Sequence, residues 1–195
     1  MTQARTFRHG IHPAEHKALT AGRLIERIAF PDQVILPLAQ HIGAPSRPLV
    51  KPGDKVYRGQ VIAAEGGFVS VPLHASVTGT VSAIAKHHHP NGSLTDAFVI
   101  EVEQNSPQTL YDEHATDWEE MVPSALIEHI QRGGFVGLGG AAFPTHVKLA
   151  IPEGKHARWL LINGCECEPY LTSDHRIMLE WADSIFLGVR VLARI

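Results

Sequence analysis

The sequence predicts a two-domain α+β protein, in which an all-β domain is followed by the first part of an α/β domain. Two changes of pattern along the 195 residues support this prediction. Residues 33–103 consist of short apolar runs broken by Gly, Pro and Asp, with no segment of helical period, as in all-β domains. Residues 117–195 instead alternate helical patterns with loops and one apolar run of strand length, which is typical of α/β layers.

The β-domain prediction depends on five apolar runs that end at turn residues. Pro52-Gly53-Asp54 and Asn91-Gly92 are the clearest turns. The candidate strands are Val34–Leu38, Val61–Ala64, Val69–Pro72, Thr80–Ile84 and Ala97–Glu103. The polar stretch Gln104–Thr116 contains few apolar residues, so we place the domain boundary there. This divides the chain into residues 1–110, beginning with an irregular segment expected to wrap over a neighbouring domain, and residues 111–195.

Composition and charge exclude several classes of protein. The chain is 44% hydrophobic and 19% charged, which predicts a packed core. Its net charge of −3 provides no basic surface for nucleic acid. No window approaches the roughly 18 apolar residues of a membrane span, and the polar N-terminus does not resemble a signal peptide. We therefore expect a soluble chain that reaches a membrane only through partner proteins.

The stretch Gly133–Lys148 is the first candidate for a ligand site. A short helix predicted over Pro123–Arg132 stops at Gly133-Gly134. A second helix is expected to open at Phe143-Pro144-Thr145, with Lys148 one turn inside it. Glycines between the helices let the backbone approach a ligand, and bare amides, a helix N-terminus and a lysine together favour a phosphate. The spacing alone leaves a ligand-free glycine connection equally open.

A second candidate is the polar loop after Trp159–Ile162, an apolar run predicted to form a buried parallel strand. Ligands of open α/β sheets bind at the carboxyl ends of strands. In this loop Asn163 could hydrogen-bond a ligand ring or hydroxyl, and Glu166 and Glu168 could accept from ribityl or ribose hydroxyls. Asp174 is then expected to cap a helix with a regularly spaced apolar face, made of Ile177, Met178, Trp181, Ile185, Val189 and Leu192.

Two groups of residues could in principle bind a metal ion, but for both we favour an interpretation in which no metal is bound. His87 to His89 are consecutive, so their side chains converge poorly on one ion, and a solvated hairpin tip is favoured. Cys165 and Cys167 lack a second pair for a four-ligand site, so free thiols in a reducing compartment are favoured. The isolated His12, His41 and His74 are interpreted as hydrogen-bonded structural residues.

The first domain resembles the biotinyl/lipoyl-type barrel-sandwich hybrid. Val50–Ile62 followed by Val71–Val81 carries the resemblance. A working carrier domain presents a lysine on a hairpin between these halves, whereas Ala63–Phe68 contains none. The resemblance therefore implies a structural or docking domain rather than a carrier of biotin or lipoate.

Several motifs, in one order, are similar to the RnfC family of the Rnf ion-translocating electron transport complexes. They are Gly10–Pro13, Leu36–Pro45, Gly53-Asp54, Gly59-Gln60, Leu73–Gly79 and Glu166–Tyr170. Gly137–Thr145 with Lys148 also resembles, more distantly, the flavin-binding glycine loop of the NADH-binding subunit of respiratory complex I. The loop with Asn163, Glu166 and Glu168 resembles that subunit's second flavin loop.

The resemblance implies a peripheral subunit on the cytoplasmic side of the bacterial inner membrane. Electrons would pass between NADH and ferredoxin-type carriers, coupled to ion translocation, through FMN and the complex's other subunits. By the resemblance, the FMN phosphate would be held by Gly137, Gly139, Gly140 and Lys148. Asn163, Glu166 and Glu168 would border the flavin ring and ribityl chain, and Phe143 would offer a stacking face to the nicotinamide nucleotide.

Three departures from the resembled families qualify this expectation. Leu138 replaces an arginine of the complex I loop, and Cys165 replaces an aspartate. No cysteine array for a 4Fe–4S cluster is present. We therefore expect an N-terminal portion of the subunit, with the clusters in its remainder, that binds FMN weakly or not at all by itself. A non-catalytic docking module with a vestigial nucleotide-binding loop is the alternative.

Overall fold

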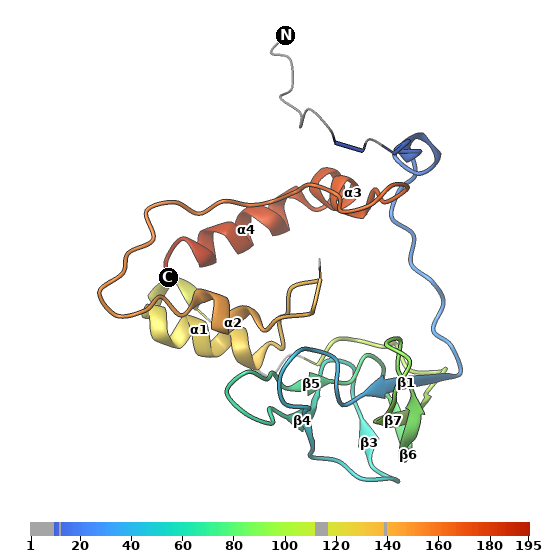
Figure 1. Cartoon of the computed structure of the whole chain (residues 1–195). Helices are drawn as coiled ribbons and strands as arrows, with labels where there is room; N and C mark the ends of the chain where they lie inside the picture. Colours follow the sequence, from blue (N-terminus) through green and yellow to red (C-terminus); the bar gives the residue numbers. More distant parts are fainter. Residues whose placement is uncertain (1–9, 12, 112–116, 139) are drawn as a thin grey trace. The chain divides into compact units, whose positions relative to one another are not determined.

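The computed structural model describes residues 10, 11, 13–111, 117–138 and 140–195 (Figure 1). The chain forms two compact units, one from Met1–Arg27 and Leu160–Arg190, the other from Ile28–Trp159 and Val191–Ile195. Across the described ranges, no helix has both the length and the apolar character that crossing a bilayer requires.

The β-domain of the larger unit consists of two antiparallel sheets. The strand order is β1-β7-β6-β3 in the first sheet and β2-β4-β5 in the second. The strands are β1 (Gln33–Pro37), β2 (Arg47–Pro48), β3 (Lys55–Val56), β4 (Val61–Ala64), β5 (Leu73–His74), β6 (Gly79–His88) and β7 (Leu94–Val102). The β6–β7 hairpin has the longest pairing, from Gly79 opposite Val102 to His88 opposite Leu94.

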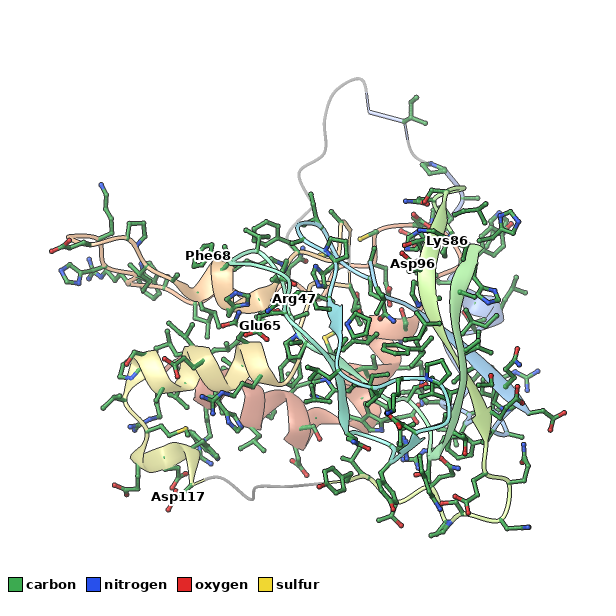
Figure 2. All side chains as sticks on the ribbon, turned by 90° about the horizontal axis from the view of Figure 1, so that it is seen from below. Arg47, Glu65, Phe68, Lys86, Asp96 and Asp117 are labelled. Atoms are coloured by element: carbon green, nitrogen blue, oxygen red, sulfur yellow. The ribbon has the colours of Figure 1, made fainter. Side chains whose placement is uncertain are left out.

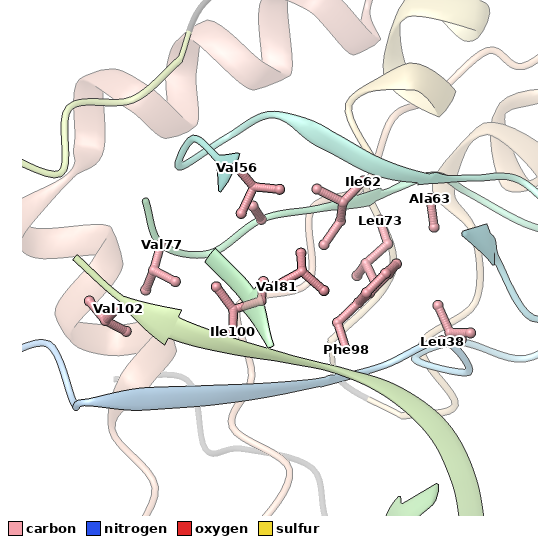
Figure 3. Close-up of a cluster of buried hydrophobic side chains, with 11 residues drawn as sticks. Leu38, Val56, Ile62, Ala63, Leu73, Val77, Val81, Phe98, Ile100 and Val102 are labelled. Atoms are coloured by element: carbon pink, nitrogen blue, oxygen red, sulfur yellow. The ribbon is translucent and has the colours of Figure 1, made fainter. Parts of the chain in front are cut away.

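The core of the β-domain is a cluster of buried apolar side chains contributed by both sheets (Figure 3). Its largest fully buried members include Phe98, Ile62 and Ile100. Burying an aliphatic or aromatic side chain of this size contributes about 1.5–3 kcal/mol. The cluster consists of Leu38, Val56, Ile62, Ala63, Leu73, Ala75, Val77, Val81, Phe98, Ile100 and Val102. A core between two sheets confirms the predicted all-β domain.

Four of the five predicted strands are present, as β1, β4, β6 and β7. The predicted strand Val69–Pro72 is wrong. The Val71 N–H donates to Nε2 of His41 at 3.3 Å, and its carbonyl accepts from the Ser46 hydroxyl at 2.9 Å. Pro72 has no N–H to donate. At Val71 and Pro72 the backbone groups that would join a sheet ladder are therefore bonded to side chains or missing, and the Val69 carbonyl accepts from the Ala44 N–H at 3.1 Å, outside any strand.

The hairpin between β6 and β7 carries the three consecutive histidines. His88 ends β6, the His89 N–H donates to the Ser93 carbonyl at 2.8 Å, and Gly92 has a positive φ of 87°. The Lys86–Asp96 ion pair joins the two strands at 2.9 Å (Figure 2). His87 and His88 are therefore the last paired residues of β6, and only His89 lies in the predicted hairpin tip. No group of three or more potential metal ligands occurs among the residues with described positions.

The larger unit continues, after a 3-10 turn η2 (Trp118–Glu120), with two packed helices, α1 (Pro123–Arg132) and α2 (Thr145–Leu149). The prediction of a helix over Pro123–Arg132 is confirmed. Pro123 occupies its first turn, and Leu126 and Ile130 are buried. The chain turns away from the helix at Gly134, whose φ is 72°. The predicted second helix is also present, but α2 has only five residues.

The two helices contact the connection between β4 and β5. The Gln131 side-chain amide donates to the Ser70 carbonyl at 3.3 Å, and Nε2 of His146 lies 3.1 Å from the Phe68 carbonyl. Figure 2 labels Phe68 on this connection. A carrier domain would present its lysine on this connection, whereas here the connection is hydrogen-bonded to α1 and α2.

The prediction of a buried parallel strand at Trp159–Ile162 is wrong for this chain. These residues belong to no strand, and their exposed fractions run from 44% to 86%. A strand is stabilised by neighbours that satisfy its N–H and C=O groups. Among the described residues after Val102, the one bridge joins Val136 and Pro144. Without partner strands the apolar run remains extended, irregular chain.

The smaller unit contains a 3-10 turn η1 (Lys17–Leu19), α3 (Ser173–Glu180) and most of α4 (Ala182–Leu192). The expected helix after Asp174 is thus divided into two. Trp181, with φ −126° and ψ 33°, is not helical. The cap residue is Thr172 and not Asp174, which lies in the first turn of α3.

Candidate functional site

The glycine loop, Gly133–Lys148, is closed by a narrow two-stranded stem. The Gly137 N–H donates to the Phe143 carbonyl, and the Thr145 N–H donates to the Phe135 carbonyl, both at 2.9 Å. At the tip Leu138 is 91% exposed, and Gly140 has no atom within 4 Å of where a Cβ would stand. The predicted site residue Gly139 lies outside the described residues. The loop therefore presents open backbone above a fixed base.

Lys148 folds back over the base of this loop. A Cβ added to Gly137 would lie 2.4 Å from Nζ of Lys148, so only glycine leaves room for the ammonium there. The same Nζ lies 6.0 Å from the centroid of the Phe143 ring. No carboxylate in the described part of the chain forms an ion pair with Lys148. The structure thus brings Gly137, Phe143 and Lys148 together around an uncompensated positive charge.

The short length of α2 changes the expected source of anion binding. A helix macrodipole is the sum of aligned peptide dipoles, and five residues supply few of them. Lys148 itself lies in the last turn of α2. Attraction for an anion at this site therefore comes from the ammonium and the loop backbone, with little from the helix terminus that the sequence suggested.

A separate cavity of about 220 Å³ lies beside the start of the glycine loop and includes Gly134 and Val136. Its wall contains His41 and His74 but neither Gly137 nor Lys148. Because the Val71 N–H donates to Nε2 of His41, Nδ1 carries the proton and donates to the Ile42 carbonyl at 3.1 Å. Burial lowers the pKa of His74, opposed by a hydrogen bond with the Arg132 backbone. Both histidines are hydrogen-bonded within the fold, as predicted, and His12 lies outside the described residues.

The acidic loop, Asn163–Tyr170, belongs to the smaller unit. Oδ1 of Asn163 accepts from the Cys165 N–H at 2.9 Å, which leaves the side-chain NH₂ as the group that can meet a ligand. Oε1 of Glu166 accepts from the His175 N–H in the first turn of α3 at 3.0 Å. Within the described residues the exposed Glu168 carboxylate has no hydrogen-bond partner. Both thiols, Cys165 and Cys167, are free and exposed.

The predicted site residues therefore form two groups, one in each compact unit. Sequence reasoning missed the residues that hold the acidic loop from the N-terminal segment. Nζ of Lys17 donates to the Leu171 carbonyl at 2.8 Å and to the Glu168 carbonyl at 3.3 Å. These partners are more than 150 residues from Lys17 and are backbone atoms, so no sequence signal marks them.

The fold and the loops define a class of protein, a barrel-sandwich domain joined to flavin-domain sequence. Residues 5–105 match the family model described as the RnfC barrel sandwich hybrid domain. Residues 130–195 match the Nuo51 FMN-binding domain. Since the first match covers more than half of the chain, this chain belongs to the RnfC family. The barrel-sandwich prediction and the FMN-domain prediction are confirmed.

Curated relatives, all C subunits of ion-translocating complexes, support this membership across the chain. The C subunit of the proton-translocating ferredoxin:NAD(+) oxidoreductase complex of Clostridium ljungdahlii is 41% identical over 191 residues, covering 98% of this chain and 42% of the relative. The C subunit of the Na(+)-translocating ferredoxin:NAD(+) oxidoreductase complex of Acetobacterium woodii is 42% identical over 186 residues, covering 95% of this chain and 42% of the relative. The C subunit of the ion-translocating oxidoreductase complex of Klebsiella pneumoniae is 40% identical over 191 residues, covering 97% of this chain and 25% of the relative. The chain thus spans less than half the length of these relatives.

Proposed function

We propose that this chain is part of the flavin-binding subunit of an ion-translocating electron transport complex that moves electrons between NADH and ferredoxin-type carriers. The observation that carries the proposal is the Lys148 ammonium over Gly137, inside a segment that matches an FMN-binding family. The relatives' names, ferredoxin:NAD(+) oxidoreductase, supply the reaction.

FMN would be held at its phosphate end by Gly137, Gly139, Gly140 and Lys148. A phosphate monoester is doubly charged near neutral pH, and an ammonium is its natural counter-charge. The backbone at Gly137 and Gly140 can approach the phosphate because no side chain stands there. This part of the site binds and orients, and the flavin when bound supplies the hydride and single-electron chemistry.

The acidic loop would contribute the contacts to the ring and ribityl chain. The Asn163 NH₂ is left to donate once Oδ1 is used by Cys165. Among the described residues nothing bonds the Glu168 carboxylate, so both its oxygens are available for hydroxyls, whereas Glu166 already uses one on α3. We assign Glu168 the larger share of ribityl binding, and Phe143 a stacking role toward the nicotinamide of NADH.

Electrons would leave through 4Fe–4S clusters toward other subunits of the complex, with this subunit peripheral on the cytoplasmic side of the bacterial inner membrane. A cubane takes four cysteine ligands, and this chain supplies only Cys165 and Cys167. The clusters are therefore proposed for the part of the subunit beyond these residues.

A flavin titration of the intact subunit tests the proposal. We expect FMN to bind stoichiometrically with quenching of its fluorescence and to give a yellow protein. NADH added without oxygen should bleach the bound flavin. A colourless subunit that does not quench FMN would contradict the proposal and favour the docking module, whose surface would include the hairpin at Phe68.

We also propose a domain boundary between Glu103 and Trp118. The first residues of this stretch are held against the barrel, since the Arg58 guanidinium donates to the Gln108 carbonyl at 3.1 Å and the Arg58 carbonyl accepts from the Tyr111 N–H. Limited digestion with a protease of broad specificity should therefore cut first after Tyr111. Earliest cuts between Val34 and Glu103, mapped by mass spectrometry, would contradict this division.

The barrel is expected to carry no biotin or lipoate. The interval between Ile62 and Val71 contains no lysine to accept either group, and its Phe68 carbonyl is bonded to His146. Intact-mass measurement of these 195 residues, expressed by themselves, should give the 21.3 kDa of the sequence. A covalent adduct mapped to this interval would overturn the interpretation.

A further inference from the structure

We propose that the N-terminal segment Glu15–Ile25 is a positioning element for the acidic loop, with Lys17 and Thr20 as its principal positioning residues. The proposal rests on the function proposed above for that loop as one wall of the flavin site. Lys17 and Thr20 are assigned no contact with the flavin. They act by fixing the backbone from which Asn163 and Glu168 reach it.

Lys17 and Thr20 bind adjoining carbonyls at the end of the loop. Nζ of Lys17 donates to the carbonyls of Leu171 at 2.8 Å and Glu168 at 3.3 Å, which uses two of its three donors. The Thr20 hydroxyl donates to the Tyr170 carbonyl at 3.1 Å. The same hydroxyl accepts from the Thr172 hydroxyl at 2.9 Å. Two side chains of one segment therefore fix the loop where it turns into α3.

The acidic loop also contacts the N-terminal segment through Tyr170, a residue with a strained backbone. The Tyr170 N–H donates to the Glu15 carbonyl at 2.8 Å, and the rings of Tyr170 and His16 stack with centroids 4.8 Å apart. Tyr170 has φ 67°, in the left-handed region. A non-glycine residue there is strained and persists only where its surroundings determine it. The segment supplies those surroundings.

The far end of the segment is anchored to α3. The Ile25 N–H donates to both carboxylate oxygens of Glu180, at 3.1 and 3.2 Å. Arg176 pairs with Glu180 and also donates to the Ala21 carbonyl at 3.1 Å. The Arg176 and Glu180 side chains are only 15% and 21% exposed, so this pair is better shielded from solvent than a surface salt bridge.

These contacts give the loop two supports. Its first half is tied to α3 through Glu166 and the His175 N–H, and its second half is tied to the segment through Lys17 and Thr20. Glu168 lies between them, with its carbonyl bound by Lys17 and its carboxylate without a partner in the described chain. The geometry therefore presents the Glu168 carboxylate while restraining its backbone.

The test measures FMN and riboflavin affinity of the intact subunit with Lys17→Met or Thr20→Val. Loss of contacts that order the loop should weaken both flavins by about the same factor, on the order of tenfold for Lys17→Met. The two factors should match because the loop borders the ring and ribityl chain, which both ligands share. Lys17→Arg and Thr20→Ser, which keep the donors, should restore most of the affinity. Lys86→Met, which removes an exposed lysine of the β6–β7 hairpin, is the matched control and should change neither affinity.

Further outcomes separate this proposal from the proposed flavin site. If Glu168→Gln and Lys148→Ala weaken FMN but Lys17→Met and Thr20→Val do not, the segment has no positioning role and the flavin site stands. If Lys17→Met lowers the melting temperature and the bound-flavin stoichiometry without changing affinity, its role is only structural and the proposal fails. If no variant, including Glu168→Gln and Lys148→Ala, changes affinity, both assignments fail. A shift in the reduction potential of the bound flavin in Lys17→Met, reversed in Lys17→Arg, would support positioning.

Discussion

Gln108→Leu is expected to lower the free energy of unfolding of the β-domain by about 1–3 kcal/mol, since it leaves the buried Thr78 N–H without its acceptor. Gln108 is 6% exposed. Its Oε1 accepts from the Thr78 N–H at 2.7 Å, and its Nε2 donates to the carbonyls of Thr78 at 3.0 Å and Glu103 at 3.2 Å. Leucine fills similar space but cannot accept from the Thr78 N–H, whereas the carbonyls of Thr78 and Glu103 still accept from backbone N–H groups. The loss is therefore one of hydrogen bonding rather than volume.

Urea unfolding of the wild-type chain and the Gln108→Leu variant would measure this difference. Gln104→Leu is the matched control. The Gln104 amide also makes two hydrogen bonds, to the Pro31 carbonyl and the Asp32 carboxylate at 3.1 Å, but it is exposed and water can replace them. The control should change stability by less than about 1 kcal/mol. Equal losses of unfolding free energy in the two variants would show that the contribution of the Gln108 hydrogen bonds does not depend on their burial.

Elements with local signals could be predicted from the sequence. The helix Pro123–Arg132 has proline in its first turn and two glycines after its end, and β4 has its predicted bounds, Val61–Ala64. Val69–Pro72 shows the limit of such signals. It reads as a strand from its apolar residues, but its backbone bonds to His41 and Ser46, and only the folded barrel brings these side chains to it.

The candidate site likewise contains residues that local sequence signals predict and residues whose contacts form only in the folded chain. Lys148 lies about one turn inside the helix that follows the glycines, so its presence beside the glycine loop was predictable from spacing. Lys17 was not, because it binds carbonyl oxygens more than 150 residues away, and every residue type carries such an oxygen. Gln108 is likewise bonded to backbone atoms. Side chains that recognise distant backbone leave no pattern that a single sequence can show.

Lys148→Ala is expected to weaken FMN binding to the intact subunit by about 10- to 100-fold, the equivalent of one charge-assisted hydrogen bond of roughly 1.5–3 kcal/mol. Riboflavin lacks the phosphate, so its affinity should change little. The ammonium has no carboxylate partner in the described chain, so its removal exposes no competing charge. Lys155→Ala, at an exposed lysine outside the loop, is the control and should leave both affinities unchanged.

Gly137→Ala tests the same contact without removing the charge. The added Cβ would lie 2.4 Å from Nζ of Lys148. Because that atom is the far end of a flexible side chain, it can move aside at little cost in stability. The displaced ammonium should nevertheless lose its position at the phosphate, so FMN affinity falls while riboflavin affinity and the unfolding midpoint stay near wild type. Equal losses for the two flavins in Lys148→Ala and Gly137→Ala would mean that Lys148 does not face the phosphate.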